Sequence, residues 1–160
     1  MATNLILQLQ DIDCQIIRFD RPEACFLEIT CRQQIEDVRG DVRDKNNWER
    51  LLKGVDVIFH FAAQTSIYFA DQNPQEDFEI NVMPLLHLLE VCRIKRQCPI
   101  IIFSGTVTEG GMPGHLPVDE TFPDLPITFY DLHKGIAETR ILRLRFLKNI
   151  NTEEKPHFLC

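Results

Sequence analysis

The sequence predicts an α/β fold built on a doubly wound parallel sheet. Two stretches, residues 55–61 and 99–104, are almost continuously apolar, which is typical of strands that are covered on both faces of a parallel sheet. A longer stretch with helical periodicity, residues 74–97, separates them. Strands that alternate with helices are joined by crossover connections, and these connections make the strands parallel.

The N-terminal part of the chain carries shorter elements. The pattern predicts the end of a helix over residues 4–10, a strand over residues 14–20 and a second short strand over residues 35–39. Asp44 is a suitable N-cap for a following helix, which Gly54 would end.

The C-terminal part begins with a loop rich in glycine and proline, residues 105–117, and continues with a predicted helix over residues 130–146. Pro84 should distort the long helix, because proline lacks the backbone N–H and clashes with the preceding turn. A chain of 160 residues suffices for one domain. We expect that domain to cover residues 1–148 and to be followed by a polar tail over residues 149–160.

Composition narrows the class of protein. Hydrophobic residues make up 44% and charged residues 26%, the balance of a globular protein. The formal net charge of -7 gives the chain no electrostatic reason to bind nucleic acid. No apolar run is long enough to span a membrane and no signal peptide pattern is present, so we expect a cytoplasmic protein. The six cysteines and five histidines are dispersed, which favours reduced thiols over disulfides and suggests no metal site.

The sharpest chemical feature is the pentapeptide Tyr130-Asp131-Leu132-His133-Lys134. Tyr130 and Lys134 are four residues apart and therefore share one helix face. The lysine charge can lower the pKa of the tyrosine, so that the phenol passes a proton near neutral pH, and lysine can also hold a ribose hydroxyl. Taken alone, this spacing is more typical of an ordinary exposed helix.

Hydroxyl and small side chains lie at the predicted strand ends, where parallel sheets bind ligands. Ser104 and Thr106 follow one buried strand, and a hydroxyl there can bond the same substrate oxygen as Tyr130. Ala62 and Ala63 follow the other buried strand, where small side chains allow a flat cofactor to approach the backbone. The alternatives are ordinary turn residues for the first pair and tight strand–helix packing for the second.

Two acids lie at earlier strand ends. Asp20 ends a strand, where a carboxylate can accept hydrogen bonds from an adenosine ribose. Asp41 follows the next strand, near an adenine position. Either acid alone is more typical of a solvated loop or a helix cap.

Together and in this order, these pieces resemble the extended short-chain dehydrogenase/reductases, the family of NAD-dependent epimerases and dehydratases. The resemblance covers roughly residues 5–140. Its elements are, in chain order, Asp20, Gly40-Asp41-Val42-Arg43-Asp44, His60-Phe61-Ala62-Ala63, Asn81-Val82, the segment from Ser104 to Thr106, Pro117-Val118-Asp119-Glu120, and Tyr130 with Lys134.

The resemblance implies a Rossmann-like sheet, an epimerase/dehydratase-type oxidoreductase, a nucleotide sugar or related alcohol/ketone as substrate, and a homodimer in the full-length form. It implies NAD as cofactor, with NADP disfavoured by the acid at residue 20. The implied catalytic residues are Thr106, Tyr130 and Lys134. The implied cofactor-binding residues are Asp20, Asp41, Val42, Ala62, Ala63, Gln64, Asn81, Ser104 and Lys134.

The chain also departs from the family pattern. The family opens with an apolar strand and a Gly-x-x-Gly-x-x-Gly turn that holds the pyrophosphate, whereas the first glycine here is Gly40. That strand is central, so the strands ending at Asp20 and Phe61 would need another shared partner. The substrate region after the Tyr-Lys helix is also unmatched. We therefore expect an incomplete sheet and weak NAD binding by this chain, and a non-catalytic binding or interaction module stays open as the alternative.

Overall fold

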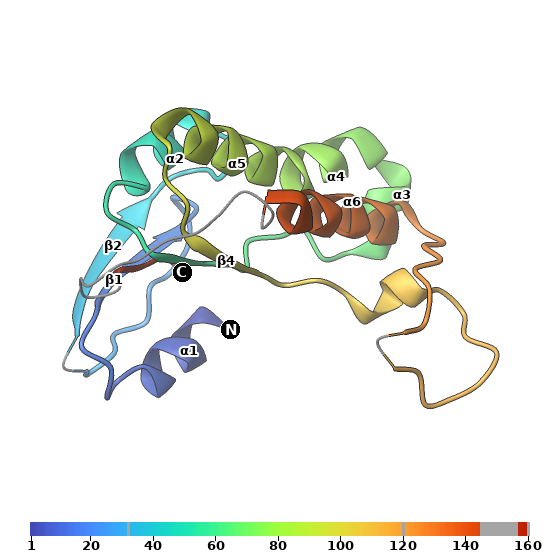
Figure 1. Cartoon of the computed structure of the whole chain (residues 1–160), viewed down its shortest axis with the longest axis horizontal. Helices are drawn as coiled ribbons and strands as arrows, with labels where there is room; N and C mark the ends of the chain where they lie inside the picture. The colour runs from blue at the N-terminus through green and yellow to red at the C-terminus, as the bar shows by residue number, and fades with distance from the viewer. Residues whose placement is uncertain (32, 120, 145–156, 160) are drawn as a thin grey trace.

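The computed structural model describes residues 1–31, 33–119, 121–144 and 157–159. They form a parallel sheet of five strands in the order β2-β1-β5-β3-β4 (Figure 1). The predicted parallel α/β fold is therefore confirmed. The strands are β1 (Gln15–Asp20), β2 (Gln34–Arg39), β3 (Val57–His60), β4 (Ile100–Phe103) and β5 (His157–Leu159).

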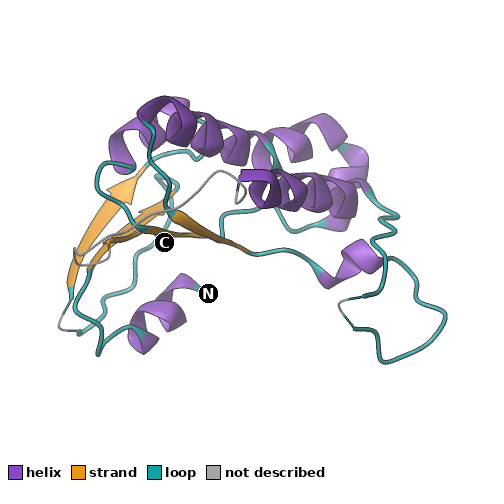
Figure 2. Cartoon of the chain, in the orientation of Figure 1, coloured by secondary structure: helices purple, strands orange, loops and turns teal. Residues whose placement is uncertain are grey.

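Helices cover both faces of the sheet, as a doubly wound fold requires. Figure 2 shows α2, α4, α5 and α6 on one side of the sheet and α1 on the other. The helices are α1 (Ala2–Gln8), α2 (Lys45–Leu51), α3 (Ile67–Gln72), α4 (Pro74–Asn81), α5 (Met83–Lys95) and α6 (Phe129–Leu144), with a 3-10 turn η1 (Val107–Gly110).

The connection from β2 into α2 follows directly from its residues. Asp44 caps the helix by accepting a hydrogen bond from the backbone N–H of Asn46 at 3.0 Å, as predicted. Gly40 is required by close approach, because a Cβ there would lie 2.8 Å from both the Asn47 amide nitrogen and the Phe19 ring. The end of β2 is thus packed directly against α2.

The predicted long helix over residues 74–97 is two helices. α4 ends at Asn81, and α5 begins at Met83 with Pro84 in its first turn. Proline is tolerated there because a first-turn N–H has no partner within the helix. The distortion expected at Pro84 is confirmed, and the single continuous helix is wrong. α3 was not predicted; Ser66 caps it by accepting from the Phe69 N–H at 3.2 Å.

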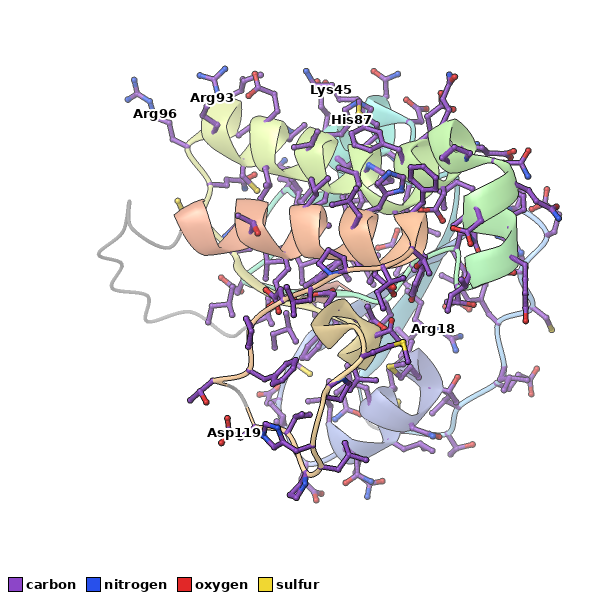
Figure 3. All side chains as sticks on the ribbon, turned by 90° about the vertical axis from the view of Figure 1, so that its right-hand side faces the viewer. Arg18, Lys45, His87, Arg93, Arg96 and Asp119 are labelled. Carbon is purple, nitrogen blue, oxygen red and sulfur yellow. The ribbon has the colours of Figure 1, made fainter. Side chains whose placement is uncertain are left out.

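Two apolar clusters hold the layers together. The larger one packs β3 against α2 and α5, and includes Trp48, Leu52, Ile58 and Leu88. The smaller one packs α1 against β1 and consists of Ile6, Leu9, Cys14 and Ile16. On the outer side of the helical layer, charged side chains such as Lys45, Arg93 and Arg96 point away from the sheet (Figure 3).

Strand β5 lies between β1 and β3, at the centre of the sheet. Phe158 is in register with Ile16 on one side and with Val57 on the other. The sequence did not predict this strand inside the expected tail, and residues 149–156 and 160 of that tail lie outside the described residues. β5 supplies the shared neighbour that β1 and β3 need for their backbone groups.

A matched pair of truncations on α5 tests the core assignment. Leu88 is 0% exposed and Ile94 is 57% exposed. Leu88→Ala should lower the free energy of unfolding by about 3 kcal/mol, since it leaves a cavity in the larger cluster. Ile94→Ala should change it by less than about 0.5 kcal/mol. Chemical denaturation measures both, and equal losses would contradict the assignment.

Candidate functional site

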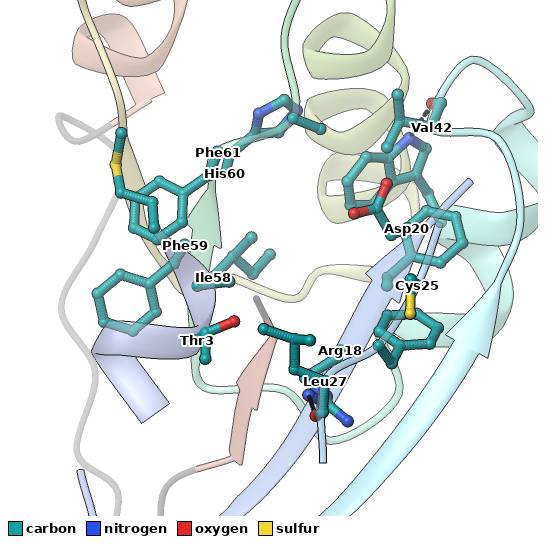
Figure 4. Close-up of a pocket in the computed structure, with 16 residues that line it drawn as sticks. Thr3, Arg18, Asp20, Cys25, Leu27, Val42, Ile58, Phe59, His60 and Phe61 are labelled. Carbon is teal, nitrogen blue, oxygen red and sulfur yellow. Dashed lines mark hydrogen bonds between the residues drawn. The ribbon is translucent and has the colours of Figure 1, made fainter. Parts of the chain in front are cut away.

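A pocket of about 320 Å³ opens where β5 ends. The paired residues of β5 reach only Ile17 on β1 and Ile58 on β3, and the following residues of these two strands line the pocket (Figure 4). The pocket therefore lies at the carboxyl ends of the parallel strands, the edge at which parallel sheets bind ligands. The lining residues are Met1, Ala2, Thr3, Arg18, Phe19, Asp20, Cys25, Phe26, Leu27, Val42, Trp48, Ile58, Phe59, His60, Phe61 and Ala62.

Three of the cofactor residues expected from the sequence line this pocket: Asp20, Val42 and Ala62. Asp20 is exposed at the end of β1, and its carboxylate accepts a hydrogen bond from the Arg21 N–H at 2.8 Å. The Val42 carbonyl accepts from the Trp48 indole N–H at 2.7 Å, which fixes the loop after β2. A carboxylate, a small side chain and an apolar side chain thus face one space.

Asp41 is not among the lining residues. Its carboxylate is bound by the Arg43 guanidinium, with the closest contact at 2.5 Å. The hydrogen bonds from Arg43 hold the pKa of Asp41 below its ordinary value, although burial opposes them. In this structure, Asp41 therefore orders its own loop.

His60 forms an apolar wall of the pocket. Its ring stacks on Trp48 with centroids 5.8 Å apart, and neither ring nitrogen has a hydrogen-bond partner. Burial lowers the pKa of His60 to about 4, and the positive charge of Lys134 acts in the same direction. The imidazole is therefore neutral at physiological pH.

The structure brings the expected catalytic residues Tyr130 and Thr106 together. Tyr130 lies in the first turn of α6 and Thr106 follows β4, and their side chains are hydrogen-bonded to each other. The Thr106 hydroxyl also lies 2.8 Å from the Thr108 hydroxyl. Two hydroxyl groups thus converge at the end of β4, beside Ser104.

Lys134 is 3% exposed and contacts the strand end directly. Its ammonium group donates a hydrogen bond to the Ser104 carbonyl and lies 4.0 Å from the centre of the Phe103 ring. Burial lowers the pKa of Lys134, while the carboxylates of Glu109, Glu138 and Asp77 oppose this shift.

The expectation that Lys134 lowers the pKa of Tyr130 is wrong for this structure. Burial raises the pKa of Tyr130, and the hydrogen bond with Thr106 only partly opposes it. Lys134 is not among the groups that shift the pKa of Tyr130; its ammonium group lies against the Ser104 carbonyl and the Phe103 ring, and burial of the phenol dominates.

Asn81 and Gln64, both expected at the cofactor, are bound to each other and form a support for the chain after β3. The Asn81 side chain accepts from the Gln64 backbone N–H at 2.9 Å and donates to the Gln64 carbonyl at 3.1 Å. Neither residue lines the pocket, and neither does Ala63. Together they fix the course of the chain immediately after Ala62.

Sequence reasoning missed two residues of this support, Asp77 and His133. The Asp77 carboxylate is fully buried and lies 2.7 Å from the Nδ1 atom of His133. Asp77 lies in the first turn of α4, where an acid is ordinary because it favours the helix dipole. His133 lies inside the Tyr-Lys pentapeptide, and its inward direction could not be read from the spacing.

Glu109 was also missed. It lies in η1, nine-tenths buried, and its Oε1 atom has no hydrogen-bond partner. Burial raises the pKa of Glu109 to about 7, and the negative charge of Glu138 adds to this effect. A buried acid thus lies between the loop that carries Thr106 and the helix that carries Tyr130.

Other kinds of site find no support in the part of the chain that the structure covers. Among the described residues, no three His, Cys, Asp or Glu side chains gather as a metal site would require. The helices described there include none that is long and apolar enough to cross a membrane.

The fold and the site together define a class. A doubly wound parallel sheet, a hydroxyl residue at a strand end and a Tyr-x-x-x-Lys pair on the following helix are the features of an extended short-chain dehydrogenase/reductase. The family model described as the NAD dependent epimerase/dehydratase family matches residues 1–151. The chain belongs to this family.

Curated relatives agree with this assignment. The chain is 36% identical over 107 residues to a putative UDP-glucose 4-epimerase of Methanocaldococcus jannaschii, an alignment that covers 66% of this chain and 35% of the relative. It is 42% identical over 73 residues to a CDP-paratose 2-epimerase of Salmonella typhi, covering 44% of this chain and 22% of the relative. The matched regions thus span half or less of the length of these curated relatives.

Solved structures show the same fold. The UDP-glucose 4-epimerase of Bifidobacterium longum, in complex with NAD+ and UDP, matches with a TM-score of 0.78 and 24% identity over 98% of this chain and 48% of that structure. The UDP-glucose 4-epimerase of Brucella ovis, in complex with NAD, matches with a TM-score of 0.72 and 26% identity over 91% of this chain and 44% of that structure.

The buried acid in η1 predicts a pH-dependent stability. The folded-state pKa of Glu109 lies above its ordinary value of 4.5. The stability that the protonated side chain contributes is therefore fully present below pH 4.5 and is lost as the pH rises through about 7. Glutamine is neutral throughout. Glu109→Gln should therefore gain stability relative to the wild type as the pH rises from about 5 to about 8.

Denaturation curves at several pH values test this expectation. The matched control is Glu76→Gln on the exposed side of α4, which should show no such trend. A constant difference between Glu109→Gln and the wild type across the pH range would contradict the prediction.

Proposed function

We propose that this chain is the nucleotide-binding half of an NAD-dependent epimerase/dehydratase acting on a nucleotide sugar or a related alcohol/ketone. The observation that carries the proposal is the convergence of Tyr130, Thr106 and Lys134 at the end of β4. This convergence lies at the same sheet edge as the pocket that contains Asp20. One elongated ligand can therefore span both.

The residues of the pocket fit the adenosine end of NAD. The Asp20 carboxylate would accept hydrogen bonds from the ribose hydroxyls, and Val42, Phe61 and Ala62 would contact the flat adenine. Bound NAD would supply the hydride acceptor and donor.

The side chains at the end of β4 have the chemistry to handle the substrate proton. Tyr130 would exchange a proton with the substrate hydroxyl, and Thr106 would hydrogen-bond the same oxygen. Lys134 would move from the Ser104 carbonyl toward the ribose and the phenol. That movement would lower the pKa of Tyr130, because an ammonium group beside a phenol favours the phenolate.

A non-catalytic binding module is the second candidate. Two observations support it. The ammonium group of Lys134 contacts the Ser104 carbonyl and the Phe103 ring, and burial raises the pKa of Tyr130. In this alternative the same pair only stabilises the contact between α6 and β4, and the chain catalyses no turnover.

The first functional prediction concerns cofactor choice. The Asp20 carboxylate should repel the 2′-phosphate of NADP, so the chain should bind NAD more tightly than NADP. We expect a difference in affinity of about tenfold, the scale of one repulsive pair of charges at an exposed site. Arg21 next to it acts in the opposite direction. Trp48, the single tryptophan, lines the pocket, so its fluorescence can follow both titrations.

Asp20→Asn should remove most of this preference, because the amide no longer repels the phosphate. The control Glu23→Gln, three residues along in the exposed loop, should retain it. NADP binding more tightly than NAD to the unaltered chain would overturn the assignment of Asp20.

The second functional prediction concerns the catalytic group. Tyr130→Phe should lower turnover of a nucleotide sugar by about a hundredfold or more and leave NAD affinity nearly unchanged, because it removes only the proton-transfer group. Thr106→Val should also lower turnover, and Lys134→Met should reduce both turnover and NAD affinity. The assays use this chain and a chimaera in which an epimerase relative supplies the remaining segments.

The matched control is Tyr68→Phe, since Tyr68 is 84% exposed on α3. It should leave turnover and affinity unchanged. Near-normal turnover in Tyr130→Phe would contradict the catalytic assignment of Tyr130, whereas absence of turnover in the unaltered chimaera would favour the non-catalytic module.

A further inference from the structure

Three segments of the chain meet at the carboxylate of Asp77. Its Oδ1 atom accepts from the Gln64 side-chain amide at 2.7 Å and from the Asn81 side-chain amide at 2.9 Å. Its Oδ2 atom lies 2.7 Å from the Nδ1 atom of His133. Gln64 belongs to the segment after β3, residues 61–66, which we call the cofactor loop, and His133 belongs to α6.

Most of this cluster is buried, and Gln64 is half-buried. Asp77 is 0% exposed, and both Asn81 and His133 are also buried. Burying a carboxylate is costly unless donors surround it, and apolar side chains can fill such a space at least as stably. Filling space therefore does not explain an acid here. One carboxylate oxygen binds the cofactor loop and the other binds α6. An apolar side chain could not make these two directed hydrogen bonds.

Each side of the carboxylate leads to the candidate site. On one side, Gln64 is held twice, through its side chain by Asp77 and through its backbone by Asn81, two residues after the pocket residue Ala62. On the other side, His133 immediately precedes Lys134 on α6 and is packed against the rings of Phe78 and Phe129.

We propose that Asp77 is a positioning residue that fixes the cofactor loop and the catalytic helix α6 relative to each other through Gln64 and His133. The inference rests on the proposed function only for the statement that the loop binds the cofactor and that α6 carries the catalytic residues. The coupling between them is a property of the chain itself.

The geometry also fixes the proton on His133. Two amide donors already occupy Oδ1 of Asp77, and a carboxylate only accepts, so Nδ1 of His133 must be the donor to Oδ2. Asparagine at position 77 would keep the Oδ1 acceptor for Gln64 and Asn81 and turn its NH2 group toward His133. Nδ1 would then become the acceptor and the proton would move to Nε2.

The experiment follows two NMR signals of the 160-residue chain. The imidazole nitrogen signals of His133 report which nitrogen carries the proton. Hydrogen exchange of the Gln64 amide, which donates to Asn81, reports the order of the cofactor loop. The Gly40 amide, bonded to the Asp20 carbonyl at 2.9 Å near the opposite edge of the sheet, is the internal reference.

His133→Phe keeps a ring between Phe78 and Phe129 but removes the donor. It should accelerate exchange at Gln64 by about tenfold, the scale of one hydrogen bond to a charged group, and leave Gly40 unchanged. His133→Asn, which restores a donor, should recover most of the protection. Asp77→Asn should move the His133 proton to Nε2. The controls are His115→Phe in an exposed loop and Glu76→Gln on α4.

Unchanged exchange at Gln64 in His133→Phe, or an equal acceleration at Gln64 and Gly40, would overturn the proposal, because the first shows no coupling and the second shows only general loss of structure. If His133→Phe does not fold, the imidazole signals decide: a wild-type proton on Nε2 overturns the proposal, and a switch from Nδ1 to Nε2 in Asp77→Asn supports it. NAD titration is a separate readout, so absence of NAD binding would count against the proposed function and leave this test intact.

Discussion

Parallel alignment of the strands is the constraint on which the site depends. Because β1, β3 and β4 run in one direction, Asp20, Ala62 and Ser104 emerge at one edge of the sheet although they lie far apart in the sequence. α6 then returns across the same edge with Tyr130 and Lys134. The strand-end residues and the residues of α6 come from separate parts of the chain. They meet because the strands are parallel.

Buried charge is concentrated around α6. Lys134 contacts a strand-end carbonyl, and the Asp77 carboxylate is surrounded by donors on α4, α6 and the cofactor loop. Glu109 differs, because one of its oxygens has no partner and burial raises its pKa to about 7. The two satisfied charges fix elements in place, whereas the acid in η1 is the group whose ionisation responds to pH near neutrality.

Much of the fold followed from local pattern. The continuous apolar runs at β3 and β4, the Asp44 cap and the break at Pro84 were visible in the residues, because each depends on neighbours in the sequence. β5 was not predictable, since three residues carry no periodicity and their role is set by partners far away in the chain. In the site, the strand-end residues were predictable by position, but the direction of Asp77, His133 and Lys134 depends on packing between elements.

The central position of β5 also shapes how the chain folds. One crossover that contains α3, α4 and α5 joins β3 to β4, and β1 pairs with β2, the next strand in the chain. Each half of the sheet is therefore made of strands that are consecutive in the sequence. Joining them requires β5, the last strand in the chain order, to enter between strands formed by much earlier residues. Closing so long a loop is entropically costly and slow. The two halves of the sheet should therefore form before β5 pairs with β1 and β3.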